Sequence, residues 1–253
     1  MNTIDYLARI KYTGELLATP EVLADLQESH LLAVPFENLD IHRGERIVLE
    51  TPLLFRKIVE RRRGGFCYEL NGLFFWLLRE LGFQTSLAMG QVYSRKLKTF
   101  GPPFDHMLIL VDFDSEQWLA DVGYGDFSIR PLKLTLHQPL FDNNGQFIIE
   151  RENDEFLKVS RFSPDEKDYV PEYLFSRKAR RLEDFSAMCL YHQTSPESHF
   201  TQNRVCTLAT HAGRITLSDH TLIITEHGIR QETQIASEKD FSQALFRYFA
   251  IAL

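Results

Sequence analysis

The stretch Arg61-Arg62-Arg63-Gly64-Gly65-Phe66-Cys67-Tyr68-Glu69-Leu70-Asn71-Gly72-Leu73-Phe74 decides how this chain is organised, because it brings a cysteine to the start of a predicted helix. Apolar residues follow at the three-and-four spacing of one helical face, and Gly82 ends the pattern. The members of this stripe are Leu70, Leu73, Phe74, Leu77, Leu78 and Leu81. Cys67 is therefore expected in the first helical turn or just before it.

The position of Cys67 is compatible with two roles. Unpaired backbone N–H groups and the positive end of the helix dipole favour a thiolate at a helix N-terminus, so the placement is expected to lower the pKa of the thiol. Free cysteines are also among the most buried residue types, and many are inert packing groups. A partner base elsewhere in the chain has to decide between these roles.

The composition is that of an ordinary globular protein. The 253 residues are 44% hydrophobic and 25% charged, enough apolar material for one large core or two to three small ones. No stretch approaches the roughly 18 uninterrupted apolar residues of a membrane span, so no membrane partner is expected. The formal charge of -7 argues against a nucleic-acid partner, although basic residues cluster locally.

The cysteines indicate the redox compartment. Cys67, Cys189 and Cys206 are an odd number with no paired spacing, so reduced thiols are expected rather than a disulfide framework. Together with the lack of a membrane segment, this predicts a cytoplasmic protein. No feature of the sequence predicts an oligomeric state.

The first third of the chain reads as helical. Thr19-Pro20-Glu21 combines a cap, a proline at the first helical position and an acid in the first turn, and Thr51-Pro52 repeats this device. Between them, Ala33 to Ile41 contains a proline, polar residues and bulky apolar side chains. We interpret this segment as a loop packed inward.

The remainder reads as short strands separated by turn signals. Apolar, β-prone runs occur at 85–92, 107–111, 118–120, 147–149 and 156–159, and this spacing predicts an antiparallel sheet or barrel. Further strands are expected at 205–210, 214–217, 221–225 and 229–234, followed by a helix capped by Ser237. These changes in secondary-structure pattern along the chain predict three domains: a helical domain at 1–83, a barrel domain at 84–190 and an α/β lid at 191–253.

Two strand ends supply a base and an orienting acid for the cysteine. His106 opens a strand and Asp121 closes the next one, so an antiparallel pairing would bring the two side chains together. A lone histidine is more commonly a satisfied core or strand-end residue, and an aspartate before Val122-Gly123 can be a turn former. The combination with Cys67 favours a catalytic triad.

These motifs resemble the arylamine N-acetyltransferase family. The resemblance is carried by the segments 63–71, 106–111 and 121–125 in this order and spacing, and by the further segments 34–39 and 195–200. It implies an α+β fold with a cysteine-protease-like core, made of a helical N-terminal domain, an antiparallel β-barrel and an α/β lid. It also implies transfer of an acetyl group from acetyl-CoA to the nitrogen of arylamines, arylhydrazines or arylhydroxylamines.

The resemblance assigns roles residue by residue. Cys67 corresponds to the acylated nucleophile, His106 to the base and Asp121 to the residue that orients the base, and kinetics are expected to be ping-pong. Phe36 and Tyr124 lie in family segments and are candidates for the aromatic wall that holds the acceptor ring, although Phe36 could equally be a core residue.

Other residues are assigned to the donor and to support. Gly125 is the candidate donor-binding glycine, because a backbone position without a side chain leaves room for acetyl-CoA to reach the sulfur. Arg63 is expected to form an ion pair with Glu37 that ties the loop at 33–41 to the nucleophile. The cations Arg95, Lys96 and Lys98 could meet the phosphates of CoA, but a solvated loop is the plainer interpretation.

The sequence also departs from the family pattern. The segment 101–105 reads Gly-Pro-Pro-Phe-Asp, where family members often carry small hydroxyl residues near the donor. The chain ends at Leu253, which is short for the family, so donor contacts from a longer C-terminal segment are not expected.

Three alternatives remain open. A thiol hydrolase or a transglutaminase-like enzyme would use the same triad. A metal site would need Cys189, His192, His199 and Cys206, of which only the first two have ligand-like spacing, so no metal is predicted. A binding module that has kept the scaffold without catalysis is disfavoured by the presence of all three triad residues.

Overall fold

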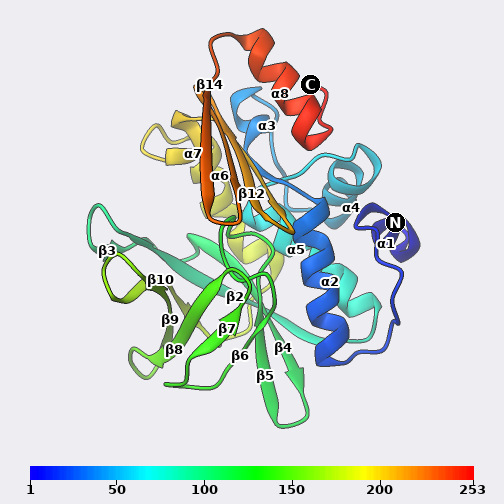
Figure 1. The fold of residues 1–253 in the computed structure, drawn as a ribbon. Coiled ribbons are helices and arrows are strands. Elements are labelled where there is room, and N and C mark those ends of the chain that lie inside the picture. The colour runs from blue at the N-terminus through cyan, green and yellow to red at the C-terminus, as the bar shows by residue number, and fades with distance from the viewer.

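The computed structural model describes residues 1–253 and combines helices with two antiparallel sheets (Figure 1). The helices are α1 Thr3–Arg9, α2 Pro20–Ala33, α3 Leu39–His42, α4 Thr51–Phe55 with a π-helical continuation Arg56–Glu60, α5 Cys67–Glu80, a 3-10 turn Leu182–Phe185, α6 Ser186–Thr194, α7 His199–Gln202 and α8 Glu238–Phe249. The strands are β1 Phe36–Glu37, β2 Gln84–Ser94, β3 Thr99–Phe100, β4 His106–Phe113, β5 Glu116–Ala120, β6 Leu132–Lys133, β7 Leu140–Asp142, β8 Gly145–Arg151, β9 Phe156–Ser163, β10 Asp168–Ser176, β11 Val205–Thr210, β12 Gly213–Ser218, β13 Thr221–Glu226 and β14 Ile229–Gln234.

Helix α5 lies in the main core and confirms the predicted helix after Cys67. Its start is fixed by Glu69, whose carboxylate accepts a hydrogen bond of 3.1 Å from the backbone N–H of Phe66. Its end is fixed by Gly82, which has a φ of +89° that suits glycine. The helix packs against β2 and β4, and its buried face belongs to the largest hydrophobic cluster of the molecule.

The other helix starts follow the sequence with two adjustments. Thr19 caps α2 as predicted, and its hydroxyl accepts a hydrogen bond from the N–H of Val22. The start of α4 differs from the predicted cap at Thr51, because Glu50 occupies the cap position and Thr51 is already helical. The segment Ala33 to Ile41 is buried as expected, but it contains β1 and the start of α3 rather than being a loop throughout.

The larger sheet has the strand order β6-β5-β4-β2-β10-β9-β8-β7, with β3 paired to β2, and curls into a nearly closed barrel. A bridge between Leu136 and Ile149 brings its two ends together. Strand β4 explains how barrel and helices share a core: Ile109 belongs to the cluster around α5, whereas Leu108 and Leu110 belong to the barrel cluster. Burial on both faces accounts for the unbroken apolar sequence of this strand.

All five strand runs predicted for the barrel are confirmed, but β10 was not predicted. It pairs with β2 on one side and β9 on the other, and its register shifts between Pro171 and Tyr173. A proline and charged residues within a run argue against a central strand, so the sequence pattern did not indicate a strand here.

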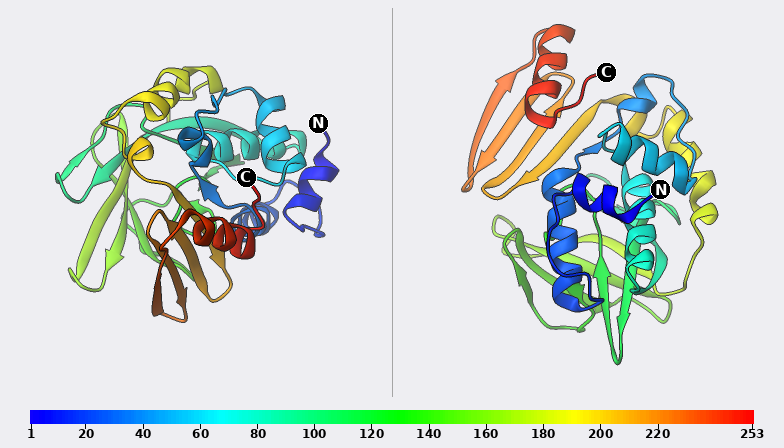
Figure 2. Two further views of the ribbon diagram at one scale, coloured as in Figure 1. Left: turned by 90° about the horizontal axis from the view of Figure 1, so that it is seen from above. Right: turned by 90° about the vertical axis from the view of Figure 1, so that its right-hand side faces the viewer.

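The smaller sheet has the order β1-β11-β12-β13-β14 and confirms the four strands predicted near the C-terminus. Helix α8 packs on it through Phe241, Leu245 and Phe249, and Ser237 caps this helix as expected. In Figures 1 and 2 the sheet and α8 lie together at the opposite end of the molecule from the β4–β5 hairpin. We call residues 203–253 the lid.

No helix combines the length and the apolar character needed to cross a lipid bilayer. The division into domains at 1–83, 84–190 and 191–253 stays a prediction. Contacts cross both of its boundaries, because α5 packs against β2 and β4, and β1 near residue 36 pairs with β11 of the lid.

Candidate active site

Cys67 is the first residue of α5, and its side chain faces a cavity of about 510 Å³. The segment that precedes Cys67 passes very close to the backbone of Pro35, because a Cβ atom on Gly64 would lie 2.0 Å from the carbonyl oxygen of Pro35. The glycine pair therefore lets the chain pass close to β1 before the helix begins. Only 3% of the Cys67 surface is exposed, so its contact with solvent is through the cavity.

The electrostatic surroundings of Cys67 correct the expectation of a lowered thiol pKa. Burial raises the pKa of Cys67 well above its usual value, and the nearby Asp105 and Asp121 add to the effect. A hydrogen bond from the backbone of Met107 lowers it, but less than burial raises it. Burial therefore disfavours a free thiolate, and His106 is the base that lines the same cavity.

His106 and Asp121 meet as the predicted strand pairing requires. His106 opens β4 and Asp121 follows β5, and these strands pair in antiparallel register. The Nε2 atom of His106 lies 2.7 Å from Oδ2 of Asp121, and both side chains are buried. This contact leaves Nδ1 as the ring nitrogen that can accept a proton, and His106 lines the same cavity as Cys67.

Asp121 is held by donors on several elements. Its Oδ1 accepts hydrogen bonds of 2.9 Å from Asn71 Nδ2 and from the backbone N–H of Gly123, and its Oδ2 accepts one of 3.1 Å from the Tyr173 hydroxyl. Its own N–H donates to Gln27 Oε1 at 3.1 Å. A carboxylate with this many donors has a fixed orientation, so it can fix the ring of His106 in turn.

Asn71, Gln27 and Tyr173 are site residues that the sequence pattern does not predict. Asn71 stands four residues after Cys67 as a fully buried polar group, and it links Asp121 to the carbonyl oxygen of Met107 at 2.6 Å. A buried amide on the predicted apolar side of a helix was the available signal for Asn71 and for Gln27. Tyr173 lies on β10, the strand that was not predicted.

The residues predicted for substrate contact all line the cavity, namely Phe36, Tyr124 and Gly125. The ring of Tyr124 stands edge-on to that of His106 with centroids 5.3 Å apart, and its hydroxyl donates to Glu172 Oε2 at 3.1 Å. Tyr124 is thus fixed against the base as well as exposed to the cavity.

Two glycines leave space beside the cysteine because they carry no side chain. A Cβ atom on Gly123 would lie 2.7 Å from Cα of Cys67, so no larger residue fits there without a shift. Gly125 has a φ of +90°, and a Cβ atom there would meet only Thr207, at 4.0 Å. Gly123 is needed for space, whereas Gly125 is needed for backbone conformation.

One side of the cavity comes from the C-terminal part of the chain, beyond what the sequence pattern predicts. Segment 195–200 supplies His199 and Phe200, and the lid supplies Val205, Thr207, Arg214 and Thr216. Pro102 and Pro103 do not line the cavity.

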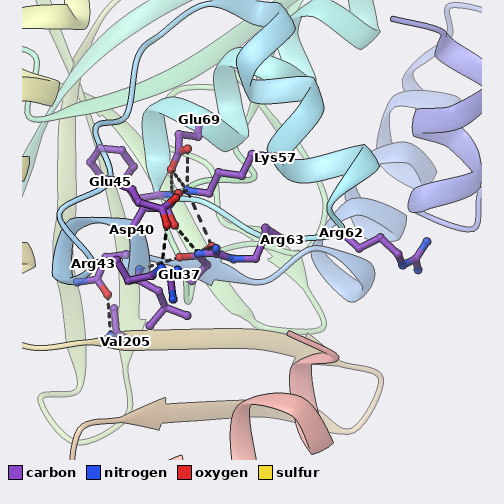
Figure 3. A network of polar contacts seen from close by, with 12 residues as sticks. Glu37, Asp40, Arg43, Glu45, Lys57, Arg62, Arg63, Glu69 and Val205 are labelled. Carbon is purple, nitrogen blue, oxygen red and sulfur yellow. Dashed lines mark hydrogen bonds and ion pairs between the residues drawn. The ribbon is translucent and has the colours of Figure 1, made fainter. Parts of the chain in front are cut away.

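A buried network of charged residues lies behind the nucleophile segment (Figure 3). As predicted, Arg63 pairs with Glu37, with Nη2 to Oε1 at 2.8 Å, and the same nitrogen lies 2.8 Å from Oδ1 of Asp40. Lys57 continues the network to Asp40 at 2.8 Å and to Glu69 at 2.9 Å. Because Glu69 also caps α5, the network connects β1, α3 and the helix that carries Cys67.

The four residues considered for a metal site make other contacts. His192 Nε2 lies 3.1 Å from Asp105 Oδ1 and its Nδ1 lies 3.0 Å from Ser198 Oγ. Cys189 Sγ contacts Gln193, the ring of His199 lies 3.9 Å from that of Phe200 between centroids, and Cys206 is packed in the lid core. No group of three or more His, Cys, Asp or Glu residues is arranged to hold a metal ion.

Comparison with known proteins agrees with this geometry. The sequence matches the family model described as N-acetyltransferase over residues 19–253. Arylamine N-acetyltransferase 1 of Homo sapiens is 34% identical over 272 residues, which cover 98% of this chain and 93% of that protein. The chain belongs to the arylamine N-acetyltransferase family. The pineal gland isozyme NAT-10 of Gallus gallus is a further relative, 33% identical over 252 residues that cover 93% of this chain and 87% of that protein.

Solved arylamine N-acetyltransferases have the same fold. The enzyme from Salmonella typhimurium superposes with a TM-score of 0.92 at 27% identity, covering 98% of this chain and 90% of that one. The Mycobacterium marinum enzyme in complex with CoA gives 0.90 at 28% identity, covering 99% and 93%. The α+β fold expected from the resemblance is therefore confirmed.

Proposed function

We propose that this chain transfers an acetyl group from acetyl-CoA to the nitrogen of an arylamine, arylhydrazine or arylhydroxylamine by a ping-pong mechanism. The observation that carries the proposal is the cavity shared by Cys67 and His106, with Asp121 bonded to the far side of the imidazole. Membership of the arylamine N-acetyltransferase family supports the same reaction.

In the first half-reaction Cys67 attacks the thioester carbonyl of acetyl-CoA. Because burial disfavours a free thiolate, His106 accepts the thiol proton at Nδ1 as Cys67 attacks, and Asp121 stabilises the imidazolium that forms. The carbon–sulfur bond to CoA breaks as the new bond to Cys67 forms. The departing CoA thiolate takes the proton from His106 and leaves as a thiol.

In the second half-reaction the amine attacks the acetyl-cysteine. His106 accepts the proton that the amine loses and passes it to the Cys67 thiolate as the acetyl group leaves. Phe36 and Tyr124 are the proposed aromatic wall for the acceptor, and Phe200, whose ring centroid lies 6.1 Å from that of Phe36, extends it.

Donor contacts are proposed at Gly125, whose backbone borders the cavity. The cations Arg95, Lys96 and Lys98 lie outside the cavity lining, and Arg95 is 3.6 Å from Glu166. Their exposure supports the solvated-loop interpretation over a dedicated phosphate site.

Intact-protein mass spectrometry separates this function from the alternatives. Acetyl-CoA alone should add one acetyl group to Cys67, and an arylamine should remove it with formation of the N-acetyl product. Cys67→Ala should show no adduct, whereas Cys189→Ala should behave like the wild type. Loss of the adduct at the same rate without an amine would favour a thiol hydrolase, and an adduct discharged only by a peptide amine would favour a transglutaminase-like enzyme.

Two further proposals concern the whole chain. All three cysteines are free, which supports a reducing compartment such as the cytoplasm. The separate clusters inside the barrel and under α8 support the division of barrel from lid, whereas the cluster around α5 combines the N-terminal helices with residues of β2 and β4.

A further inference from the structure

We propose that His192 is a positioning residue of the acetyl-transfer site, which acts by fixing Asp105 and with it the turn that carries the base His106. The inference rests on the proposed function, since it concerns the same nucleophile, but it assigns a residue outside both the triad and the cavity lining. His192 lies on α6 and is 3% exposed. Asp105 directly precedes His106, the first residue of β4.

The turn before His106 is strained. Phe104 has a φ of +67°, a left-handed backbone conformation that is unfavourable for residues other than glycine. Such a conformation persists only where the surrounding contacts enforce it, and it is common at functional sites. The contacts that hold Phe104 and Asp105 therefore determine where His106 lies.

Two side chains hold this turn from outside. The hydroxyl of Tyr68, the residue after Cys67, donates to the carbonyl oxygens of Phe104 at 2.8 Å and of Asp105 at 3.2 Å. His192 holds the side chain of the turn, because its Nε2 lies 3.1 Å from Oδ1 of Asp105. The rings of Tyr68 and His192 are stacked on each other, with centroids 6.1 Å apart. They form one support between the nucleophile helix and the strand that begins with the base.

The ring of His192 is fixed on its far side as well. Its Nδ1 lies 3.0 Å from Oγ of Ser198, and this oxygen also accepts a hydrogen bond of 3.3 Å from the N–H of Phe200. The serine hydroxyl can therefore donate its own proton to Nδ1, and the ring proton then lies on Nε2 and faces Asp105. A ring bonded at both nitrogens cannot turn away from Asp105 without losing both contacts.

The carboxylate of Asp105 needs this donor because it lies beside the nucleophile. Asp105 lines the same cavity as Cys67, and its negative charge adds to burial in raising the pKa of the Cys67 thiol. His192 is the only side chain that donates to Asp105, and the N–H of Val92 lies 3.4 Å from the other carboxylate oxygen. A hydrogen bond to the charged form stabilises it and partly offsets its effect on the thiol.

The two members of the pair should therefore differ in their effect on Cys67. Loss of the donor at His192 releases the turn and leaves the Asp105 charge uncompensated, so the thiol should react more slowly. Loss of the charge at Asp105 keeps an acceptor for His192 and removes one opponent of the thiolate, so the thiol should react no more slowly than in the wild type. A pair that served only the fold would give the same result for both changes.

Alkylation of Cys67 by iodoacetamide near neutral pH tests this difference, with every variant kept well below its unfolding temperature. The amide of His192→Asn replaces Nδ1 and faces Ser198, whereas the longer amide of His192→Gln replaces Nε2 and can donate to Asp105. His192→Asn should slow alkylation by about tenfold, the lower end of the range for a hydrogen bond to a charged group. His192→Gln should recover most of the wild-type rate, and Asp105→Asn should react at the wild-type rate or faster.

A matched control comes from the same helix. Thr194→Ala removes an exposed hydroxyl that bonds only the carbonyl oxygen of Leu190, and it should leave the alkylation rate unchanged. The proposal is overturned by a wild-type rate in His192→Asn, by a rate in His192→Gln as low as that of His192→Asn, or by an equal loss in Asp105→Asn.

A second measurement keeps this inference separate from the proposed reaction, since alkylation needs neither acetyl-CoA nor an amine. The rate at which acetyl-CoA acetylates Cys67 is followed by intact-protein mass spectrometry and should fall in His192→Asn as alkylation does. If no acetylation occurs even in the wild type while the order of alkylation rates holds, only the proposed function fails. Equal acetylation rates in the wild type and His192→Asn overturn the positioning role and leave the proposed function standing.

Discussion

At the scale of single residues, the site depends on how Cys67 is activated. A helix N-terminus alone does not ionise this thiol, since burial raises its pKa and the nearby carboxylates oppose a second negative charge. The proton has to move to His106, whose far nitrogen is fixed by Asp121. The base is therefore as necessary as the nucleophile even for simple alkylation of the cysteine.

Replacement of the base should expose this dependence. Cys67 in the wild type should react with iodoacetamide faster than Cys189 and Cys206, which do not line the cavity. His106→Gln should slow alkylation of Cys67 by roughly tenfold or more near pH 7, because no imidazole accepts the proton. Peptide mass spectrometry of timed samples gives all three rates, with Cys206 as the internal control. An unchanged Cys67 rate would mean that the helix terminus activates the thiol.

The triad could be predicted from sequence because each member marks an element boundary. Cys67 begins a helix, His106 begins a strand and Asp121 directly follows the next strand, so local patterns and one hairpin place them. Tyr173 and the lid residues that line the cavity could not be predicted in this way. Their roles depend on contacts between segments far apart in the chain, and no local pattern records those contacts.

At the scale of elements, the buried charges fix β1, α3 and α5 relative to one another. Arg63 and the neighbouring Arg62 form a matched pair for testing this, since Figure 3 shows Arg63 within the network and Arg62 pointing away from it. Arg63→Ala leaves Glu37 and Asp40 with one cation fewer and should cost about 3 to 5 kcal/mol of unfolding free energy. Arg62→Ala should cost less than about 0.5 kcal/mol.

Urea denaturation of both variants measures these costs. If Arg63→Ala unfolds at the same urea concentration as Arg62→Ala, the network does not support the nucleophile segment. A lower midpoint with normal acetylation of Cys67 in the folded fraction would assign the network to stability alone.

The same network predicts a pH dependence of stability. Burial raises the pKa of Glu69 from 4.5 to about 7, with Lys57 opposing the shift and Glu37 adding to it. Between these values the folded protein binds more protons than the unfolded chain, so the Glu69 contribution weakens as the pH rises from about 4.5 through 7. Glu69→Gln removes this loss. Its unfolding free energy relative to the wild type should therefore rise by about 2 to 3 kcal/mol between pH 5 and pH 8.

Chemical denaturation at both pH values tests this sign. Glu60→Gln alters an exposed acid at the end of the π-helical turn and should show the pH dependence of the wild type. A relative stability of Glu69→Gln that stays constant with pH, or falls, would show that Lys57 keeps Glu69 ionised at no net cost.

The success of element prediction depended on pattern length and on special residues. The α5 stripe and the alternating lid strands were recognised because periodicity persists over whole elements. The cap at Thr51 was misplaced by one residue, and β10 was missed because Pro171 lies inside it. Strand β1 has two residues, too few for any periodicity, and is defined by its pairing with β11.

At the scale of the whole molecule, the active site depends on how the lid is attached. The lid supplies Val205, Thr207, Arg214 and Thr216 to the cavity, but its pairing with β1 involves only two residues on that side. No sequence pattern predicts this attachment, because it joins segments near residues 36 and 206. The pairing with β1 and the packing of β11 against α2 therefore hold this side of the cavity in place.

Asn38 is the side chain that strengthens the connection. It is 1% exposed, and its Nδ2 donates to the carbonyl oxygens of Phe200 at 2.9 Å and Asn203 at 2.8 Å. Its Oδ1 accepts a hydrogen bond of 2.8 Å from the N–H of Val205. Loss of the amide leaves the N–H of Val205 and the carbonyl oxygen of Asn203 without this part-buried partner, while the carbonyl oxygen of Phe200 keeps His42 Nε2 at 3.0 Å, so Asn38→Ala should destabilise the lid by roughly 2 to 4 kcal/mol.

Hydrogen exchange monitored by mass spectrometry tests whether the effect is confined to the lid. In Asn38→Ala, amides of β11 to β13 should exchange faster by about two orders of magnitude, while β4 and β5 keep their protection, because local opening of the lid leaves the barrel core intact. Asn153→Ala is the matched control, since Asn153 accepts hydrogen bonds only from Glu155 and Phe156 in an exposed turn and should affect the β8–β9 hairpin alone. Uniformly faster exchange in all strands of Asn38→Ala would show instead that lid and barrel unfold as one unit.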